Sequence, residues 1–192
     1  LSANGSIGGV GAPVLTAADT LVFSANGAGN VVISERDAVS VSGSSGSGDI
    51  TVSTDDGNLT VGGAIATGGD IALNADDSLL VNAALDGDGV QLVAGGDITQ
   101  TAAGIITADT LGGSSGGSTT LSEVNQINTL ASFDSDGFSL RNGRTLTVGS
   151  GAVVEGGDIA LTTTVGNIVV NGTLLADPVF VDGVITRGGG TV

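Results

Sequence analysis

The chain has 192 residues, of which 35 are Gly and 2 are Pro; 40% are hydrophobic but only 2% are aromatic, so any core must be aliphatic. Four Arg and no Lys stand against 20 acidic residues, giving a formal net charge of −16, which argues against nucleic acid or an anionic membrane as a partner. The absence of Cys and His excludes disulfides, thiolate metal sites and the commonest general base, and no apolar run approaches the ~18 residues of a membrane span.

Turn glycines recur along the chain at intervals of about twenty residues. This period, with roughly three short strands in each, predicts an all-β fold, a triangular parallel β-helix or β-solenoid. We expect residues 1–192 to form a single solenoid segment of about nine coils. The predicted coils begin near Gly9, Gly29, Gly48, Gly69, Gly89, Gly117, Gly137, Gly157 and Asp177.

Short segments of alternating apolar and polar residues fill these coils. One face of each segment is expected to pack inside and the other to meet water. Gly or a β-branched residue interrupts every window long enough for a helix. The strands predicted most clearly are 50–52, 59–61, 64–67, 71–73, 79–81, 83–85, 119–121, 127–130, 132–133, 138–140 and 146–148.

A Gly-Asp-Ile motif marks the start of several predicted coils. Residues 48–61 and 157–170 are near copies, and a third copy begins at residue 69. The Asp after each Gly is interpreted as a turn residue whose side chain caps the next backbone N–H; a cation-binding edge is the alternative. The predicted turn residues are Gly48, Asp49, Gly69, Asp70, Gly96, Asp97, Gly157 and Asp158.

One interval, from Gly89 to Gly117, is 28 residues long and ends in a run rich in Gly and Ser. We therefore predict a loop insertion at about 112–117. A loop that breaks a regular rod is also the natural place for a binding site.

The Gly-Asp-Ile-x-Leu repeats, together with segments 15–21, 104–111 and 124–133, resemble the shaft of filamentous-haemagglutinin-like exoproteins, the two-partner secretion adhesins of Gram-negative bacteria. The resemblance covers nearly the whole chain. It implies a right-handed parallel β-helix, export to the cell surface and a role in adhesion or filament structure. The amino-terminal secretion domain of that family has no match here.

Two acidic pairs have the carboxylate spacing of Ca²⁺ loops. They are Asp86 with Asp88 and Asp134 with Asp136. They lack the remaining positions of an EF-hand and the nonapeptide period of calcium β-rolls. We interpret them as solvated turns and expect no cofactor, with weak Ca²⁺ binding as the alternative.

Catalysis is not expected. Ser has no His to activate it, and the chain lacks the Trp and Tyr platforms of carbohydrate clefts. Arg36, Arg141 and Arg144 lie near acids in the sequence, which surface ion pairing explains. A polysaccharide-active enzyme remains the third alternative; loss of turnover in Arg141→Ala would support it.

The sequence therefore predicts a structural or adhesive segment of an extracellular surface filament. Neither end resembles the polar cap of a solenoid, so we expect a piece of a longer chain or a subunit whose ends are covered. The expected partner is another copy, stacked through exposed strand edges. A glycan- or receptor-binding module is the alternative.

Overall fold

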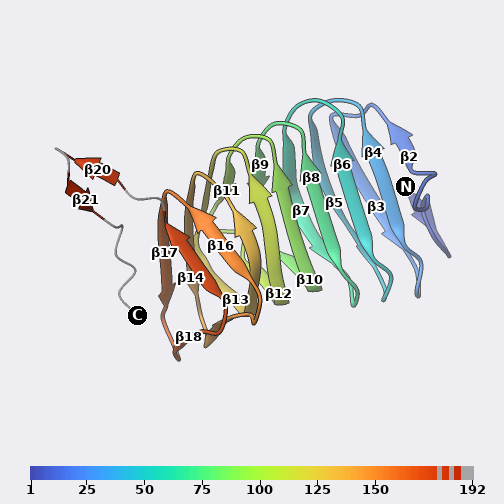
Figure 1. The fold of residues 1–192 in the computed structure, drawn as a ribbon. Coiled ribbons are helices and arrows are strands. Elements are labelled where there is room, and N and C mark those ends of the chain that lie inside the picture. The colour runs from blue at the N-terminus through green and yellow to red at the C-terminus, as the bar shows by residue number, and fades with distance from the viewer. Residues whose placement is uncertain (177–178, 182–183, 187–192) are drawn as a thin grey trace.

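The computed structural model is an all-β solenoid. The structure describes residues 1–176, 179–181 and 184–186, and no helix occurs among them. Nineteen strands form one sheet that winds around a single axis (Figure 1). The predicted fold class is confirmed, with about nine turns. Asp177, where the last coil was predicted to begin, lies outside the described residues. The described residues of that coil, 179–181 and 184–186, pair antiparallel with each other and do not join the solenoid sheet.

Most strands are short. The longer ones, β10, β12 and β13, continue through a bend of the coil without interruption. The first eleven are β1 (Ser2–Ala3), β2 (Val14–Thr16), β3 (Thr20–Ala25), β4 (Val31–Glu35), β5 (Val39–Ser45), β6 (Ile50–Thr54), β7 (Leu59–Ala66), β8 (Ile71–Ala75), β9 (Leu79–Val81), β10 (Leu85–Ala94) and β11 (Ile98–Gln100). The remainder are β12 (Ile106–Ser115), β13 (Ser118–Asp134), β14 (Gly137–Asn142), β15 (Leu146–Val148), β16 (Val153–Gly156), β17 (Asp158–Thr163), β18 (Ile168–Val170), β19 (Thr173–Ala176), β20 (Val179–Val181) and β21 (Val184–Thr186).

Each strand pairs in parallel with the strand one coil further along the axis. We call the residues that hold equal places in successive coils a column. One column runs through Ile50, Ile71, Val90, Leu111 and Leu130. Its members lie 19 or 21 positions apart in the sequence, which confirms the predicted period of about twenty. The parallel sheet ends at β19, and β20 pairs only with β21, in antiparallel fashion.

Three faces make up each coil. The face that contains β4, β6 and β8 is called face one and carries the column just described. Face two contains β9 and β11. Face three contains the end of β7 and the start of β10. The predicted three-strand coil is therefore present, although several strands run through a corner from one face to the next.

The predicted loop insertion at 112–117 is wrong. Gly112 and Gly113 lie inside β12 and pair with Gln91 and Leu92 of the preceding coil. The long interval arose because its two glycine markers lie at different corners: Gly89 precedes face one, whereas residue 117 precedes face two. The spacing of 28 therefore measures one coil plus part of another.

An enlarged corner does exist, between faces two and three. In each coil we compare the last paired residue of face two with the first paired residue of face three. Their separation grows along the chain: two positions from Val41 to Gly43, four from Val81 to Leu85, and six from Gln100 to Ile106. The connecting residues 101–105, which outnumber 82–84 of the preceding coil by about two, form a turn in which the Gly104 N–H donates to the Thr101 carbonyl at 2.8 Å. Because Gly and Ala dominate this turn, its sequence gave no strong loop signal.

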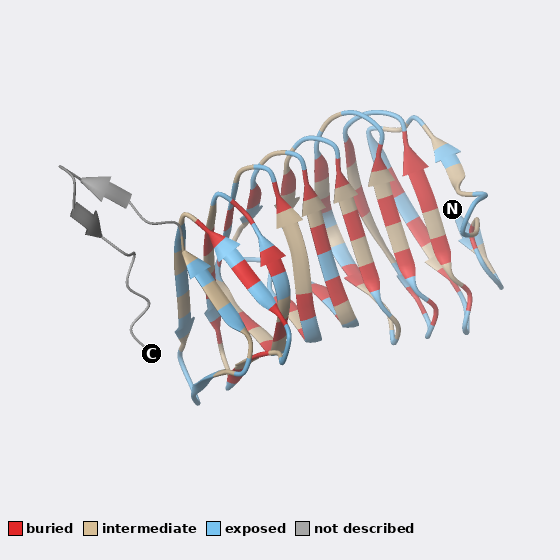
Figure 2. Cartoon of the chain, in the orientation of Figure 1, coloured by how far each residue is buried: buried red, intermediate tan, exposed pale blue. Residues whose placement is uncertain are grey.

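The core is a narrow aliphatic stack along the axis. Inward positions alternate with outward ones along the strands, which produces the banded burial pattern in Figure 2. Phe133 and Phe138 form the one aromatic contact among the described residues, with ring centroids 4.6 Å apart. Gly43 lies against the ring of Phe23, and Gly113 pairs with Phe133. Gly43 thus leaves space for the ring of Phe23 in the preceding coil.

Candidate functional site

Asp49 and Asp70 lie in successive coils at the corner that precedes face one. The Asp49 carboxylate oxygen Oδ1 accepts the backbone N–H of Asp70 at 3.1 Å. Asp70 Oδ1 in turn accepts the N–H of Gly89 at 2.9 Å, and Asn30 accepts the N–H of Asp49 at 3.0 Å. These side chains accept backbone donors, but not the next N–H along the chain that was predicted. The capped N–H belongs to the next coil along the axis, so each bond ties two coils together.

Asp97 and Asp158 lie at a different corner, the one that precedes face two. Asp97 Oδ1 accepts the N–H of Ser118 at 2.8 Å, and Asp158 pairs with Gly137. The copies of the Gly-Asp-Ile motif therefore start on two different faces. The sequence period could not distinguish these corners, because each is followed by a short strand of the same alternating pattern.

The glycines of the motif are required by close packing between coils. A Cβ on Gly48 would lie 2.4 Å from the Gly29 carbonyl oxygen, and a Cβ on Gly157 would lie 2.5 Å from that of Asp136. At Gly69 and Gly96 the nearest atoms belong to side chains of the preceding coil. Backbone packing between coils thus excludes a side chain at Gly48 and Gly157, and Asp158 is the first residue of β17.

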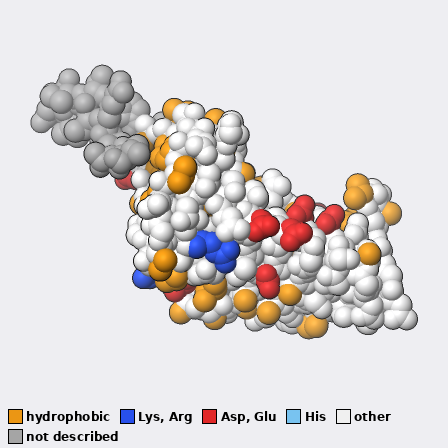
Figure 3. Space-filling model, turned by 90° about the horizontal axis from the view of Figure 1, so that it is seen from below, with side chains coloured by type: hydrophobic (Ala, Val, Ile, Leu, Met, Phe, Trp, Pro, Cys, Tyr) orange, Lys and Arg blue, Asp and Glu red, His pale blue; other side chains and the backbone are white. Residues whose placement is uncertain are grey.

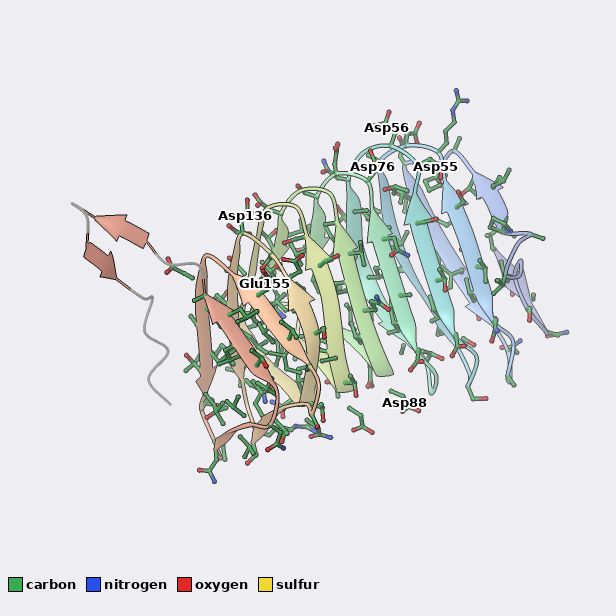
Figure 4. All side chains as sticks on the ribbon, in the orientation of Figure 1. Asp55, Asp56, Asp76, Asp88, Asp136 and Glu155 are labelled. Carbon is green, nitrogen blue, oxygen red and sulfur yellow. The ribbon has the colours of Figure 1, made fainter. Side chains whose placement is uncertain are left out.

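The prediction that the two acidic pairs are solvated turns is in part wrong: the first pair lies in β10, and Asp134 is the last residue of β13. Asp86 lies within β10, an exposed strand position that was predicted to be a loop, and Asp88 follows two residues later. Figure 4 shows Asp88 at one edge of the solenoid and Asp136, with Glu155, at another. Within the part of the chain that the structure describes, no three His, Cys, Asp or Glu side chains are grouped as metal ligands would be.

A shallow groove of about 510 Å³ runs across the outer surface of face one, over β6, β8, β10 and β12. It is hollow because the outward positions in two of these coils hold only Ala72 and Gly112, while Gln91 stands between them. The groove is lined by Asp49, Ile50, Thr51, Asp70, Ile71, Ala72, Gly89, Val90, Gln91, Thr110, Gly112, Gly113, Ala131 and Ser132.

Hydroxyl, amide and carboxylate groups supply the polar part of this groove. Thr51, Thr110 and Gln91 offer both donors and acceptors, whereas Asp49 and Asp70 offer acceptors along one rim. The lining contains neither an aromatic ring nor a cationic side chain. These groups suit a ligand rich in hydroxyl or other donor groups, and the carboxylates oppose a phosphate or sulfate.

Arg144 is held by amide side chains rather than by a carboxylate. Its Nη1 donates to Asn128 Oδ1 at 2.9 Å and its Nε to Gln126 Oε1 at 3.2 Å. Asn128 Nδ2 then donates to Asp109 Oδ1 at 2.7 Å, so the guanidinium reaches an acid only through Asn128. In Figure 3 Arg side chains lie beside a group of acidic side chains on the underside of the solenoid.

Surface ion pairing was expected for Arg36, which lies between Glu35 and Asp37, but Glu35 is not on the surface. The carboxyl group is fully buried. Its Oε2 accepts the Thr16 hydroxyl at 2.5 Å, and its Oε1 accepts the backbone N–H groups of Ala18 at 2.9 Å and Arg36 at 3.1 Å. Glu35 therefore closes a corner of the first coils from inside.

A buried amide cluster at the enlarged corner was not foreseen. Asn125 Oδ1 accepts Gln100 Nε2 at 2.6 Å and the backbone N–H of Ile106 at 2.9 Å. In the next coil Asn142 accepts the Ile127 N–H at 2.9 Å and donates to the Ile127 carbonyl at 2.8 Å. Both Asn are fully buried. Their sequence signal, an Asn where neighbouring coils have Ile or Leu, appears only after the coils are aligned.

Comparison with known proteins identifies no relative of this chain. No family model, no curated protein and no solved structure matches it. Among the described residues, no helix is long and apolar enough to cross a membrane.

Proposed function

We propose that this chain is a structural and adhesive segment of an extracellular bacterial surface filament or adhesin shaft, in which coils stack end to end through exposed strand edges. The resemblance in repeat texture to filamentous-haemagglutinin-like shafts supports export from a Gram-negative bacterium. The solenoid provides length and stiffness, because every coil is bonded to its neighbours by parallel backbone ladders.

The observation that carries this proposal is the last coil. Leu146 and Val148 are fully buried. Their partners in the next coil are less covered: Ile168 is 36% exposed, and Val170 is half-buried. Ile168 and Val170 thus hold inward positions that in every central coil are covered. Covering them with another coil would bury apolar surface and extend the parallel sheet, which within the described residues stops at β17, β18 and β19.

Electron microscopy of the purified chain over a range of concentrations tests this proposal. We expect fibres with an axial repeat of ~4.8 Å, the spacing of paired strands. Ile168→Asp should shorten the fibres to discrete rods, because a carboxylate would be buried at the junction. Val165→Asp is the matched control, since Val165 is 67% exposed in the turn before β18, and it should leave the fibres intact. Short rods of the unmodified chain at every concentration would contradict axial stacking.

A second candidate function is a glycan- or receptor-binding module, and the groove on face one favours it. The groove places acceptor groups of Asp49 and Asp70 beside Thr51 and Gln91 over several coils. Such an arrangement fits an extended chain of hydroxyl-bearing units that lies along the solenoid axis. Residues 112–115 belong to β12, so deleting 112–117 would disrupt the solenoid instead of removing a binding loop.

A glycan array, followed by affinity measurements on any hit, tests the second candidate. Ala72→Phe fills the groove and should weaken binding by at least about tenfold. Thr60→Phe is the control, since Thr60 holds the outward position of face two in a neighbouring strand. Equal affinity of the two variants and the unmodified chain would exclude the groove as the binding site.

A further inference from the structure

The chain contains four Asn-Gly pairs, which begin at Asn4, Asn26, Asn142 and Asn171. Asn-Gly is the pair in which the following backbone nitrogen approaches the side-chain carbonyl most easily, because Gly lacks a Cβ and rotates freely. All four pairs are chemically alike in an unfolded chain. Any difference between them in the native protein must come from the fold.

Deamidation of Asn at such a pair needs no reactant other than water. The Gly nitrogen forms a bond to Asn Cγ, the Cγ–Nδ2 bond breaks, and the side-chain nitrogen leaves as ammonia with the proton released from the Gly amide. Water then opens the resulting succinimide at one carbonyl or the other, giving Asp or isoaspartate. One water is consumed and one ammonia released, with no change of oxidation state.

At Asn142 the fold prevents the Gly143 nitrogen from approaching the side-chain carbonyl carbon. Its side chain is fully buried and makes three hydrogen bonds, two to Ile127 and one from Nδ2 to the Arg144 carbonyl at 3.0 Å. The attacking nitrogen is also engaged, because the Gly143 N–H donates to the Asn125 carbonyl at 2.6 Å. Cyclisation there requires the corner to open first.

At Asn26 the surroundings are permissive. Asn26 and Gly27 are both exposed, and no atom lies within 4 Å of the place where a Cβ on Gly27 would stand. The side chain makes a single exposed hydrogen bond, from Nδ2 to Asn4 Oδ1 at 3.1 Å. Little has to break before the Gly27 nitrogen turns toward Cγ.

We infer that Asn26-Gly27 is a spontaneous deamidation and isoaspartate site, and that the fold holds Asn142-Gly143 inert. Conversion at residue 26 adds a negative charge to an already acidic chain and removes the donor that meets Asn4. Formation of isoaspartate also lengthens the backbone at the end of β3, next to its pairing with β1. The N-terminal coils therefore change with the age of the protein while the amide cluster does not.

Peptide mapping of the aged protein tests this inference. Trypsin cuts after Arg and so places the two sites in different peptides, 1–36 and 142–144. The native chain is incubated at mildly alkaline pH, then unfolded and digested. Deamidation in peptide 142–144 should be at least about tenfold slower than in peptide 1–36, because local opening must precede it. A parallel incubation in guanidinium chloride should abolish that difference.

The variant Asn26→Gln is the matched control. It keeps an amide at this position but would require a less favourable six-membered ring, so deamidation of peptide 1–36 should fall to the part contributed by Asn4 and Asn30. Equal native rates in the two peptides would overturn the inference, as would unchanged deamidation of peptide 1–36 in Asn26→Gln. Absence of deamidation in native peptide 1–36, with reaction in guanidinium chloride, would overturn it as well.

Discussion

Asn142 takes the place of a backbone pairing partner for Ile127, because its amide group meets both the N–H and the carbonyl of that residue. This residue occupies a column in which earlier coils have Ile65, Leu85 and Ile106. A polar side chain is tolerated there because every one of its polar atoms has a partner; within the described residues no buried side-chain polar atom is left unbonded.

Replacing Asn142 with Ala should lower the free energy of unfolding by about 3 kcal/mol, because it leaves the buried N–H and carbonyl of Ile127 without partners. Urea denaturation followed by circular dichroism measures the change. Asn128→Ala is a suitable comparison, since Asn128 is exposed, and should cost less than about 1 kcal/mol. Equal effects of the two substitutions would show that the amide of Asn142 is not structural.

Gly113 offers a second test at the residue scale. A Cβ there would lie 1.9 Å from the Leu92 carbonyl oxygen, and its φ is +153°. Gly113→Ala should therefore cost more than about 2 kcal/mol. Gly151→Ala separates the two causes: Gly151 has φ +77° but no atom within 4 Å of its Cβ position, so only the backbone term of about 1 kcal/mol is expected. Thermal unfolding of both variants would reveal whether the clash matters.

At the scale of the strands and turns, side-chain oxygens at the corners extend the backbone ladder. At the corner that precedes face one and at the corner that precedes face two, Asn, Asp or Ser accepts the N–H of the next coil. The bonds are Asn30 to Asp49, Asp49 to Asp70 and Asp70 to Gly89 at one corner, and Asn58 to Ser78, Ser78 to Asp97 and Asp97 to Ser118 at the other. The corners are therefore bonded along the axis as the strands are.

Asp70→Ala should destabilise the solenoid by about 1 kcal/mol, because the Gly89 N–H loses its acceptor. Asp70→Asn keeps an acceptor oxygen and removes the like charge beside Asp49, so its stability should equal or exceed that of the unmodified chain. Denaturant midpoints of the two variants, compared in low and high salt, separate the hydrogen bond from the charge. A loss as large in Asp70→Asn as in Asp70→Ala would mean that the negative charge itself is needed.

For the whole molecule, stability is a sum over neighbouring coils. Each coil contacts the coils before and after it, as in other repeat proteins, so the ends are covered on one side only. Leu73, in a central coil, is fully buried, whereas Leu161 near the end is only partly buried. The same aliphatic side chain therefore contributes differently according to its place along the axis.

Leu73→Ala should cost about 3 kcal/mol, within the usual range for a buried Leu, and Leu161→Ala about 1 kcal/mol. Hydrogen exchange should show the same gradient, with slower exchange in β8 than in β17. If fibres form by axial stacking, Leu161→Ala should become more costly in the assembled state. An equal cost of both substitutions in the dispersed chain would argue against coil-by-coil additivity.

The sequence by itself determined the repeat length, the alternating strands, the aliphatic core and the parallel solenoid, because these depend on local periodicity and on the need of each short strand to bury one face. Strands 50–52, 71–73 and 146–148 were recognised on that basis. It could not determine which corner each glycine occupies, since all corners have similar turn residues. Only the tertiary structure decided that Asp49 and Asp97 stand at different corners, that 112–115 is a strand, and that Ala72 and Gly112 leave a groove. Those features arise from the alignment of residues about twenty positions apart. Assigning a turn to the wrong corner leaves the local alternation of apolar and polar residues unchanged, so the sequence alone does not reveal the mistake.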